Sequence, residues 1–133
     1  MKKFISAVLA VSAAALFYSC SGNINLDGKW EIVSLGGEAV EATETDPYLE
    51  FNTETHEVHG HTGCNIMNGS FSQDGKKLTF GNMATTMMAG PDMDPEREVL
   101  DAINKASSVK SAAGNKLQIS DADGTLLMEL QKK

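Results

Sequence analysis

The residues best suited to chemistry lie in one short segment, HGHTGCNIMNGSF, which runs from His59 to Phe71. It contains two histidines, one cysteine, two asparagines and three glycines. Imidazole and thiolate groups bind transition metals, a thiolate beside an imidazole can act as a nucleophile, and glycine with asparagine forms tight turns. The segment therefore has three interpretations: a metal site, a catalytic thiol or a structural corner.

A metal site would draw its ligands from His59, His61 and Cys64, since zinc accepts any mixture of imidazole and thiolate. In a strand, His59 and His61 share a face because side chains alternate, whereas His56 points to the other face. Methionine thioethers could instead bind Cu(I), although methionine more often fills gaps in a core. We predict no bound metal or cofactor, and a zinc or copper site is the alternative. The methionine candidates are Met67, Met83, Met87, Met88 and Met93.

A catalytic role for Cys64 requires a base and a third group that orients the base. His59 and His61 are close to Cys64 in sequence, which by itself does not supply that arrangement. The sequence also contains no G-x-S-x-G elbow, phosphate-binding loop, H-E-x-x-H pair or G-x-G-x-x-G fingerprint. We therefore predict that the chain has no catalytic residues and is not an enzyme, with a thiol enzyme or redox sensor as the alternative.

A structural corner accounts for more of the residues together. Gly63 can adopt a positive φ, Asn65 tolerates the same region and can bond its amide to the loop backbone, and Cys64 would be a small buried apolar residue between them. Isolated strand glycines such as Gly60 and Gly69 mark a bend or the close approach of another backbone. The segment is then predicted to fix the crossing of two hairpins.

The rest of the chain mostly alternates short apolar and polar runs with turn residues, which is the pattern of antiparallel strands. Turn chemistry is supplied at Gly36-Gly37, Asn52-Thr53, Gln73 to Gly75 and Gly81-Asn82. Strands are predicted at Lys29 to Leu35, Tyr48 to Phe51, Glu57 to His61, Ile66 to Phe71, Lys77 to Phe80, Ala84 to Met88, Ser108 to Ala112, Lys116 to Ser120 and Thr125 to Gln131.

Helical periodicity occurs once, in EREVLDAINKA, where Val99, Leu100 and Ile103 share one face. Asp94 is expected to cap this helix, and Pro95 suits its first position. In the last predicted strand, Leu126, Met128 and Leu130 line one face. The predicted fold class is α+β: a mainly antiparallel, curved or barrel-like sheet with one packed α-helix.

The N-terminus has the features of an export signal, with Lys2 and Lys3 before a short apolar, alanine-rich run. The run ends at Ser19-Cys20, where a small residue precedes a cysteine as in bacterial lipoproteins. We expect residues 1–19 to be a signal peptide, residues 20–26 to be a tether lipidated at Cys20, and residues 27–133 to form one domain. The chain would then be anchored to a membrane without spanning it.

Charge and cysteine content restrict the partners. The formal net charge is −7 and the acidic residues are spread along the chain, so we expect no nucleic-acid partner. The chain has two cysteines, and acylation of Cys20 would leave Cys64 without an intramolecular disulfide partner. The expected partners are the membrane, through the anchor, and a protein of the cell envelope; the sequence does not determine the oligomeric state.

The dense segment resembles the G-x-x-G-C-N-x-x-x-G-x-[FY] signature of the META domain, the domain of HslJ-like heat-shock lipoproteins. The likeness includes an opening Gly28-x-Trp30 followed by Leu35, the TTMMA run from Thr85 to Ala89, and the helical segment from Glu96 to Ile103. It covers nearly all of the chain after the signal. The signature residues are Gly60, Gly63, Cys64, Asn65, Gly69 and Phe71.

This resemblance implies a small antiparallel, barrel-like sheet with one helix. It also implies an envelope protein associated with heat shock, novobiocin resistance, or secretion and virulence, and it implies no catalytic residues. Where the family often has a second cysteine after TTMMA, this chain has Gly90. Ser21, in place of aspartate after Cys20, resembles lipoproteins that are sorted to the outer membrane. The expected function is stress or antibiotic tolerance through binding of an envelope component.

Overall fold

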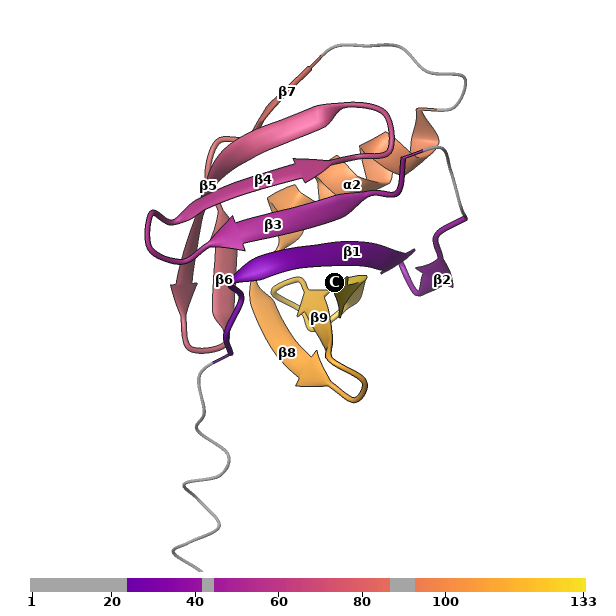
Figure 1. The fold of residues 1–133 in the computed structure, drawn as a ribbon. Helices are drawn as coiled ribbons and strands as arrows, with labels where there is room; N and C mark the ends of the chain where they lie inside the picture. The colour runs from indigo at the N-terminus through magenta and orange to yellow at the C-terminus, as the bar shows by residue number, and fades with distance from the viewer. Residues whose placement is uncertain (1–23, 42–44, 87–92) are drawn as a thin grey trace, which may run out of the picture.

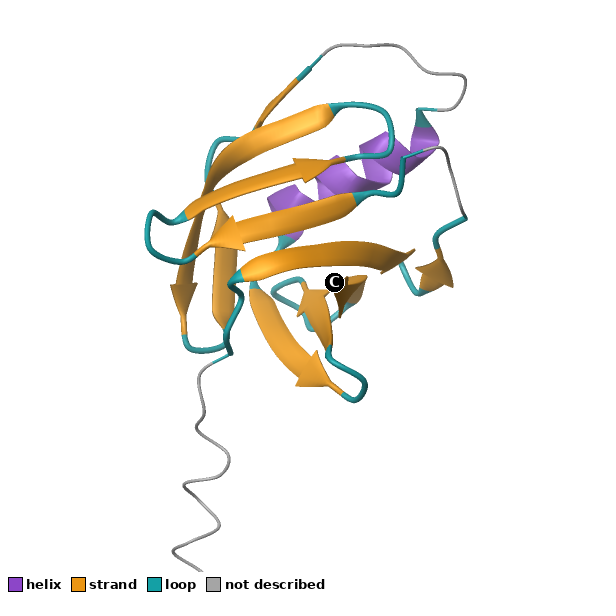
Figure 2. Ribbon diagram, viewed as in Figure 1, coloured by secondary structure: helices purple, strands orange, loops and turns teal. Residues whose placement is uncertain are grey.

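The computed structural model describes residues 24–41, 45–86 and 93–133, and these residues form ten strands and one helix (Figures 1 and 2). The helix, α2, spans Asp94–Lys105. The strands are β1 Gly28–Leu35, β2 Glu38–Ala39, β3 Tyr48–Asn52, β4 Glu57–His61, β5 Ile66–Asp74, β6 Lys77–Phe80, β7 Ala84–Thr85, β8 Ser108–Ala112, β9 Lys116–Ser120 and β10 Leu126–Lys132.

The strands form a single antiparallel sheet in the order β10-β9-β8-β6-β5-β4-β3-β1-β2, with β7 paired to β5. Strand β10 also pairs with β1, so the sheet curves round and closes on itself. Tight turns join neighbouring strands, and positive φ angles occur at Gly36, Gly37 and Gly75 as the turn chemistry predicts. The predicted fold class, a curved antiparallel sheet with one helix, is confirmed.

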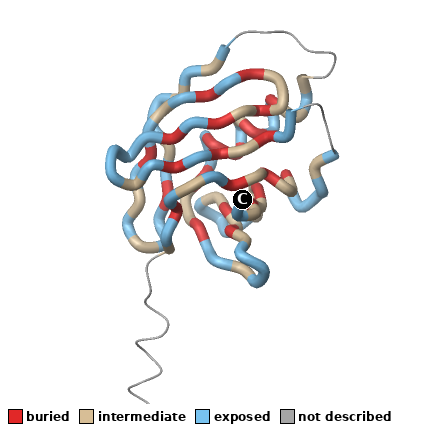
Figure 3. The backbone as a smooth tube through the Cα atoms, viewed as in Figure 1, coloured by how far each residue is buried: buried red, intermediate tan, exposed pale blue. Residues whose placement is uncertain are grey.

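The core lies inside this ring, and α2 packs against β1, β6 and β10. Buried positions alternate with exposed ones along the strands, as Figure 3 shows, because successive side chains point to opposite faces. Leu49 and Val58 are fully buried in β3 and β4, and Met67 in β5. Met67 is thus a core residue, in keeping with the gap-filling role of methionine.

The helix differs from the prediction at its start. Asp94 does not cap it: Met93 occupies the N-cap position, no side chain makes a cap hydrogen bond, and Asp94 instead pairs with Arg97 at 3.1 Å. Val99 and Ile103 face the core as predicted, and Leu100, on the same face, is partly buried. No helix in the described ranges is long and apolar enough to cross a membrane.

Several strands differ from the predictions. Strand β5 continues past Phe71 to Asp74, and the two-residue strand β2 has too little pattern to be recognised in the sequence. In β10 the pairing with β9 shifts register between Leu126 and Met128, so Leu127 rather than Leu126 packs on the core. Only Ala84 and Thr85 form strand β7; Met87 and Met88, also predicted there, lie outside the described residues.

Two residues before β1 also pack on the core. Leu26, expected at the end of the tether, is fully buried, and its carbonyl accepts a 2.7 Å hydrogen bond from Trp30 Nε1. Ile24 also packs on the core, and its carbonyl accepts a hydrogen bond from Gln73 Nε2 at 2.7 Å. Apolar side chains at these positions are stabilised by burial, which a solvated tether would not provide. Residues 1–19, predicted to be a signal peptide, and Cys20 lie outside the described residues.

Candidate functional site

Residues 62–65 connect β4 to β5 and contain the centre of the dense segment. Gly63 has a φ of +99°, a conformation that favours glycine. The Thr62 amide donates to the Asn65 carbonyl at 2.9 Å, which closes the turn, and the Gly63 amide donates to His61 Nδ1 at 2.9 Å. The segment is therefore a tight turn whose backbone groups are held within the loop.

The Thr62 hydroxyl organises this turn. Its oxygen accepts hydrogen bonds from the amides of Cys64 at 3.1 Å and Asn65 at 2.8 Å, and it donates to Glu96 Oε1 at 2.9 Å. A hydroxyl offers one donor and two acceptor positions, so all three are used. Thr62 is 1% exposed, and leaving any of these groups without a partner would carry a desolvation cost.

Asn65 links the loop to two other segments. Its Nδ2 donates to Glu96 Oε1 at 2.7 Å, and its Oδ1 accepts from the Thr86 hydroxyl at 2.8 Å. Thr86 Oγ1 in turn accepts from the Ile66 amide at 3.1 Å. Asn65 tolerates a positive φ but does not adopt one here: among the described non-glycine residues, only His56 and Asn115 have positive φ.

Glu96 stands at the centre of this arrangement, in the first turn of α2, and is 8% exposed. One of its oxygens accepts from both Thr62 and Asn65, so the helix is attached to the β4–β5 turn. We call Thr62, Asn65, Thr86 and Glu96 the loop–helix network. It joins three separate stretches of sequence: the β4–β5 turn, the segment at Thr86 and the first turn of α2. Hydrogen bonds to a charged group are stronger than those between neutral groups.

Cys64 occupies the exposed side of the same turn. A buried thiol is expected from the sequence, but Cys64 is only partly buried, because its neighbours Thr62 and Asn65 take the inward positions. Its thiol donates to the Met93 thioether, with the two sulfur atoms 3.7 Å apart. The prediction that Cys64 is a buried apolar residue is therefore wrong.

The histidines make separate contacts. His59 Nδ1 is in hydrogen-bond contact with Asn68 Oδ1 across the β4–β5 pair, and the His61 ring stacks on Tyr48 with centroids 6.5 Å apart. His56 adopts a φ of +61° just before β4. Within the residues that the structure describes, no three side chains of the His, Cys, Asp and Glu types gather as metal ligands. His59, His61 and Cys64 therefore do not form the alternative ligand set.

The remaining signature residues pack closely. A Cβ atom at Gly60 would collide with the Tyr48 carbonyl oxygen and lie 3.0 Å from Met67 Cε. A Cβ at Gly69 would lie 2.8 Å from the Asn82 carbonyl oxygen. Such distances leave space for hydrogen only.

The Phe71 ring, the last of the signature residues, meets Phe51 edge to face, with centroids 5.0 Å apart. This geometry is favourable for aromatic pairs. Phe71 is 5% exposed, so its contribution is to the core.

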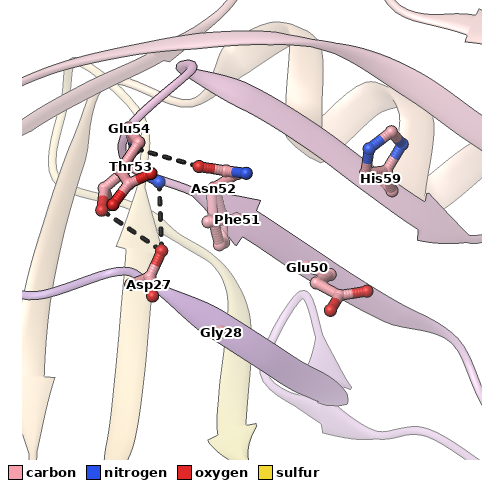
Figure 4. A pocket seen from close by; sticks show the side chains of 8 residues that line it. All are labelled: Asp27, Gly28, Glu50, Phe51, Asn52, Thr53, Glu54 and His59. Carbon is pink, nitrogen blue, oxygen red and sulfur yellow. Dashed lines mark hydrogen bonds between the residues drawn. The ribbon is translucent and has the colours of Figure 1, made fainter.

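A surface hollow of about 460 Å³ lies at the other end of β4 (Figure 4). Asp27 Oδ1 accepts from the amide and hydroxyl of Thr53 at 3.1 and 3.2 Å, and Asn52 Oδ1 accepts from the Glu54 amide at 3.0 Å. These polar groups stabilise the β3–β4 turn. Of the dense segment, only His59 lines the hollow.

Comparison with known proteins agrees with the fold. A solved NMR structure is 19% identical, with a TM-score of 0.63 over 80% of this chain and 89% of the other. An NMR structure of a protein from Burkholderia xenovorans is 22% identical, with a TM-score of 0.61 over 84% and 90%. The crystal structure of a DUF4847 family protein from Bacteroides vulgatus is 13% identical, with a TM-score of 0.61 over 83% and 95%. None of the curated proteins compared with this chain matches it.

At these identities the solved structures show a shared fold alone. The model of the META domain matches residues 23–133, which include every element described above. This chain therefore belongs to the META domain family.

Proposed function

We propose that this chain is a lipid-anchored protein of the cell envelope, most simply of the outer membrane, that supports stress or antibiotic tolerance by binding an envelope component without catalysing a reaction. The loop–helix network is the observation that supports a role without catalysis. Thr62 and Asn65 both donate to Glu96, and Thr62 accepts from the Asn65 amide, so the most distinctive polar residues hold the fold together.

The anchor is supported by the sequence around Cys20 and by the place where the domain begins. Four residue steps separate Cys20 from Ile24, which packs on the core, and they reach at most about 14 Å. A lipidated Cys20 would hold the domain close to the bilayer.

The anchor would then favour one orientation of the domain. Asp27 is hydrogen-bonded to Thr53 in the β3–β4 turn, and Ile24 to Gln73 near the β5–β6 turn, so the described part of the chain begins at this end of the sheet (Figure 1). The β4–β5 turn lies at the other end of β4, one strand length away. It would face away from the membrane and be available to a partner in the envelope.

Replacement of Cys20 tests the proposal. Cys20→Ser should move the chain from the membrane fraction to the soluble or signal-retaining forms, abolish its lipid modification by mass spectrometry, and fail to restore survival after heat or novobiocin to cells that lack the chain. Cys64→Ser, which leaves the anchor site intact, is the matched control and should stay in the membrane fraction. A lipid-free chain that carries the wild-type Cys20 would contradict the proposal.

A further inference from the structure

Two sulfur-bearing residues come together where the β4–β5 turn meets α2. Cys64 belongs to the turn and Met93 to the N-cap of the helix, 29 positions later in the sequence, and their sulfur atoms are 3.7 Å apart. Both residues are partly exposed, whereas Met67 and Met128 are fully buried. An ion from solvent can therefore reach this pair, while the core methionines are closed to it.

We propose that Cys64 and Met93 form a binding site for a soft monovalent metal ion, Cu(I) or Ag(I). Thiolate and thioether are the protein ligands that such ions prefer. Binding replaces the S–H bond of Cys64 by a sulfur–metal bond and releases the proton to solvent, and the Met93 thioether donates a lone pair. No electron is transferred.

The separation of the two sulfur atoms suits one ion. With each sulfur about 2.3 Å from the metal, a distance of 3.7 Å corresponds to a sulfur–metal–sulfur angle of about 107°. This is close to the tetrahedral angle, so the two sulfur atoms are spaced as two ligands of one four-coordinate ion would be.

Both ligands are held before the metal arrives. The Cys64 amide donates to Thr62 Oγ1, and the Met93 carbonyl accepts the first helical hydrogen bond from the Arg97 amide at 3.1 Å. Thr62 and the same helix are joined through Glu96. The loop–helix network therefore fixes the distance between the two backbones, and holding a site in place before binding lowers the cost of binding.

The site differs from the set that the sequence suggested, since neither His59 nor His61 is needed. It is also independent of the lipid anchor, because its ligands lie within the folded domain. The test uses the full chain with Cys20→Ser, purified in detergent, in which Cys64 is the only thiol of the chain's two cysteines. Failure of this test leaves the membrane assignment unaffected.

The measurement is an anaerobic Cu(I) titration against a chromogenic chelator, with the ultraviolet thiolate-to-copper band as a second readout. The Cys20→Ser parent should bind one Cu(I), and Cys64→Ser should bind at least about tenfold more weakly. Met93→Leu, which keeps the volume of the side chain, should bind roughly fivefold more weakly. Met83→Leu, which alters a methionine packed against Gly69, should bind like the parent.

Thermal melting of each variant without metal separates loss of ligand from loss of fold, and Cys64→Ala replaces Cys64→Ser if the serine variant is unfolded. A parent that cannot compete with the chelator would overturn the proposal. So would a Met93→Leu variant that binds Cu(I) as tightly as the parent, because the ion would then be held by the thiol without the thioether.

Discussion

Glu96→Ala should lower the free energy of unfolding by about 2 to 4 kcal/mol, a large loss for a domain of this size. The substitution removes the oxygen that accepts from both Thr62 Oγ1 and Asn65 Nδ2. Both donors are almost fully buried, so each would lose its hydrogen bond without gaining full access to water. Equilibrium unfolding in urea, followed by the fluorescence of Trp30, measures the effect.

Two matched variants identify the cause. Glu98→Ala removes a carboxylate from an exposed position on the same helix and should change stability by less than about 0.5 kcal/mol. Glu96→Gln retains a carbonyl oxygen that can accept, so we expect a loss between those of the two alanine variants. Equal stabilities of Glu96→Ala and Glu98→Ala would show that the buried carboxylate contributes nothing to the attachment of the helix.

Gly60→Ala should destabilise the domain by about 3 kcal/mol, because overpacking of a closed core forces the backbone to move. The added Cβ collides with the Tyr48 carbonyl oxygen and crowds Met67 and Leu49, at 3.0 and 3.1 Å. A carbonyl oxygen in a paired strand cannot turn aside as a flexible side chain would. Thermal melting and urea unfolding of the purified variant measure the loss.

Gly36→Ala is the control for this prediction. Gly36 has a φ of +60° and open space around its Cβ position, so alanine there brings backbone strain of about 1 to 2 kcal/mol and no collision. We expect Gly60→Ala to be the more damaging of the two. A Gly60→Ala variant as stable as the wild type would mean that β3 and β4 can separate at this point without cost.

Much of the fold could be predicted from local patterns. In β3 and β4, apolar Leu49, Phe51 and Val58 alternate with exposed residues because one face of the sheet is buried and the other is solvated. Glycines in the turns and the helical spacing of Val99 and Ile103 add independent signals of the same local kind. The closure of the sheet through β1 and β10 joins the two ends of the domain, and no local pattern specifies it.

The site could be predicted only in part, because its contacts are long-range. The sequence indicates a turn at Gly63, but the pairing of Thr62 with Glu96 spans 34 positions and depends on where the helix docks. One local signal was missed. A threonine hydroxyl that accepts from the amides two and three residues later is a recognised turn motif, and Thr62 forms this motif with Cys64 and Asn65. Cys64 is partly exposed because the side chains of Thr62 and Asn65 point inward. The order of residues in the sequence does not show this.

The glycine-cysteine-asparagine turn attaches α2 to the sheet through the loop–helix network. A double-mutant cycle on Asn65 and Glu96 tests it most directly, with stability measured for Asn65→Ala, Glu96→Ala and the double variant. Because the two side chains share a 2.7 Å hydrogen bond inside one network, we expect a coupling energy of about 1 to 3 kcal/mol. Two losses that simply add, to within about 0.5 kcal/mol, would contradict it.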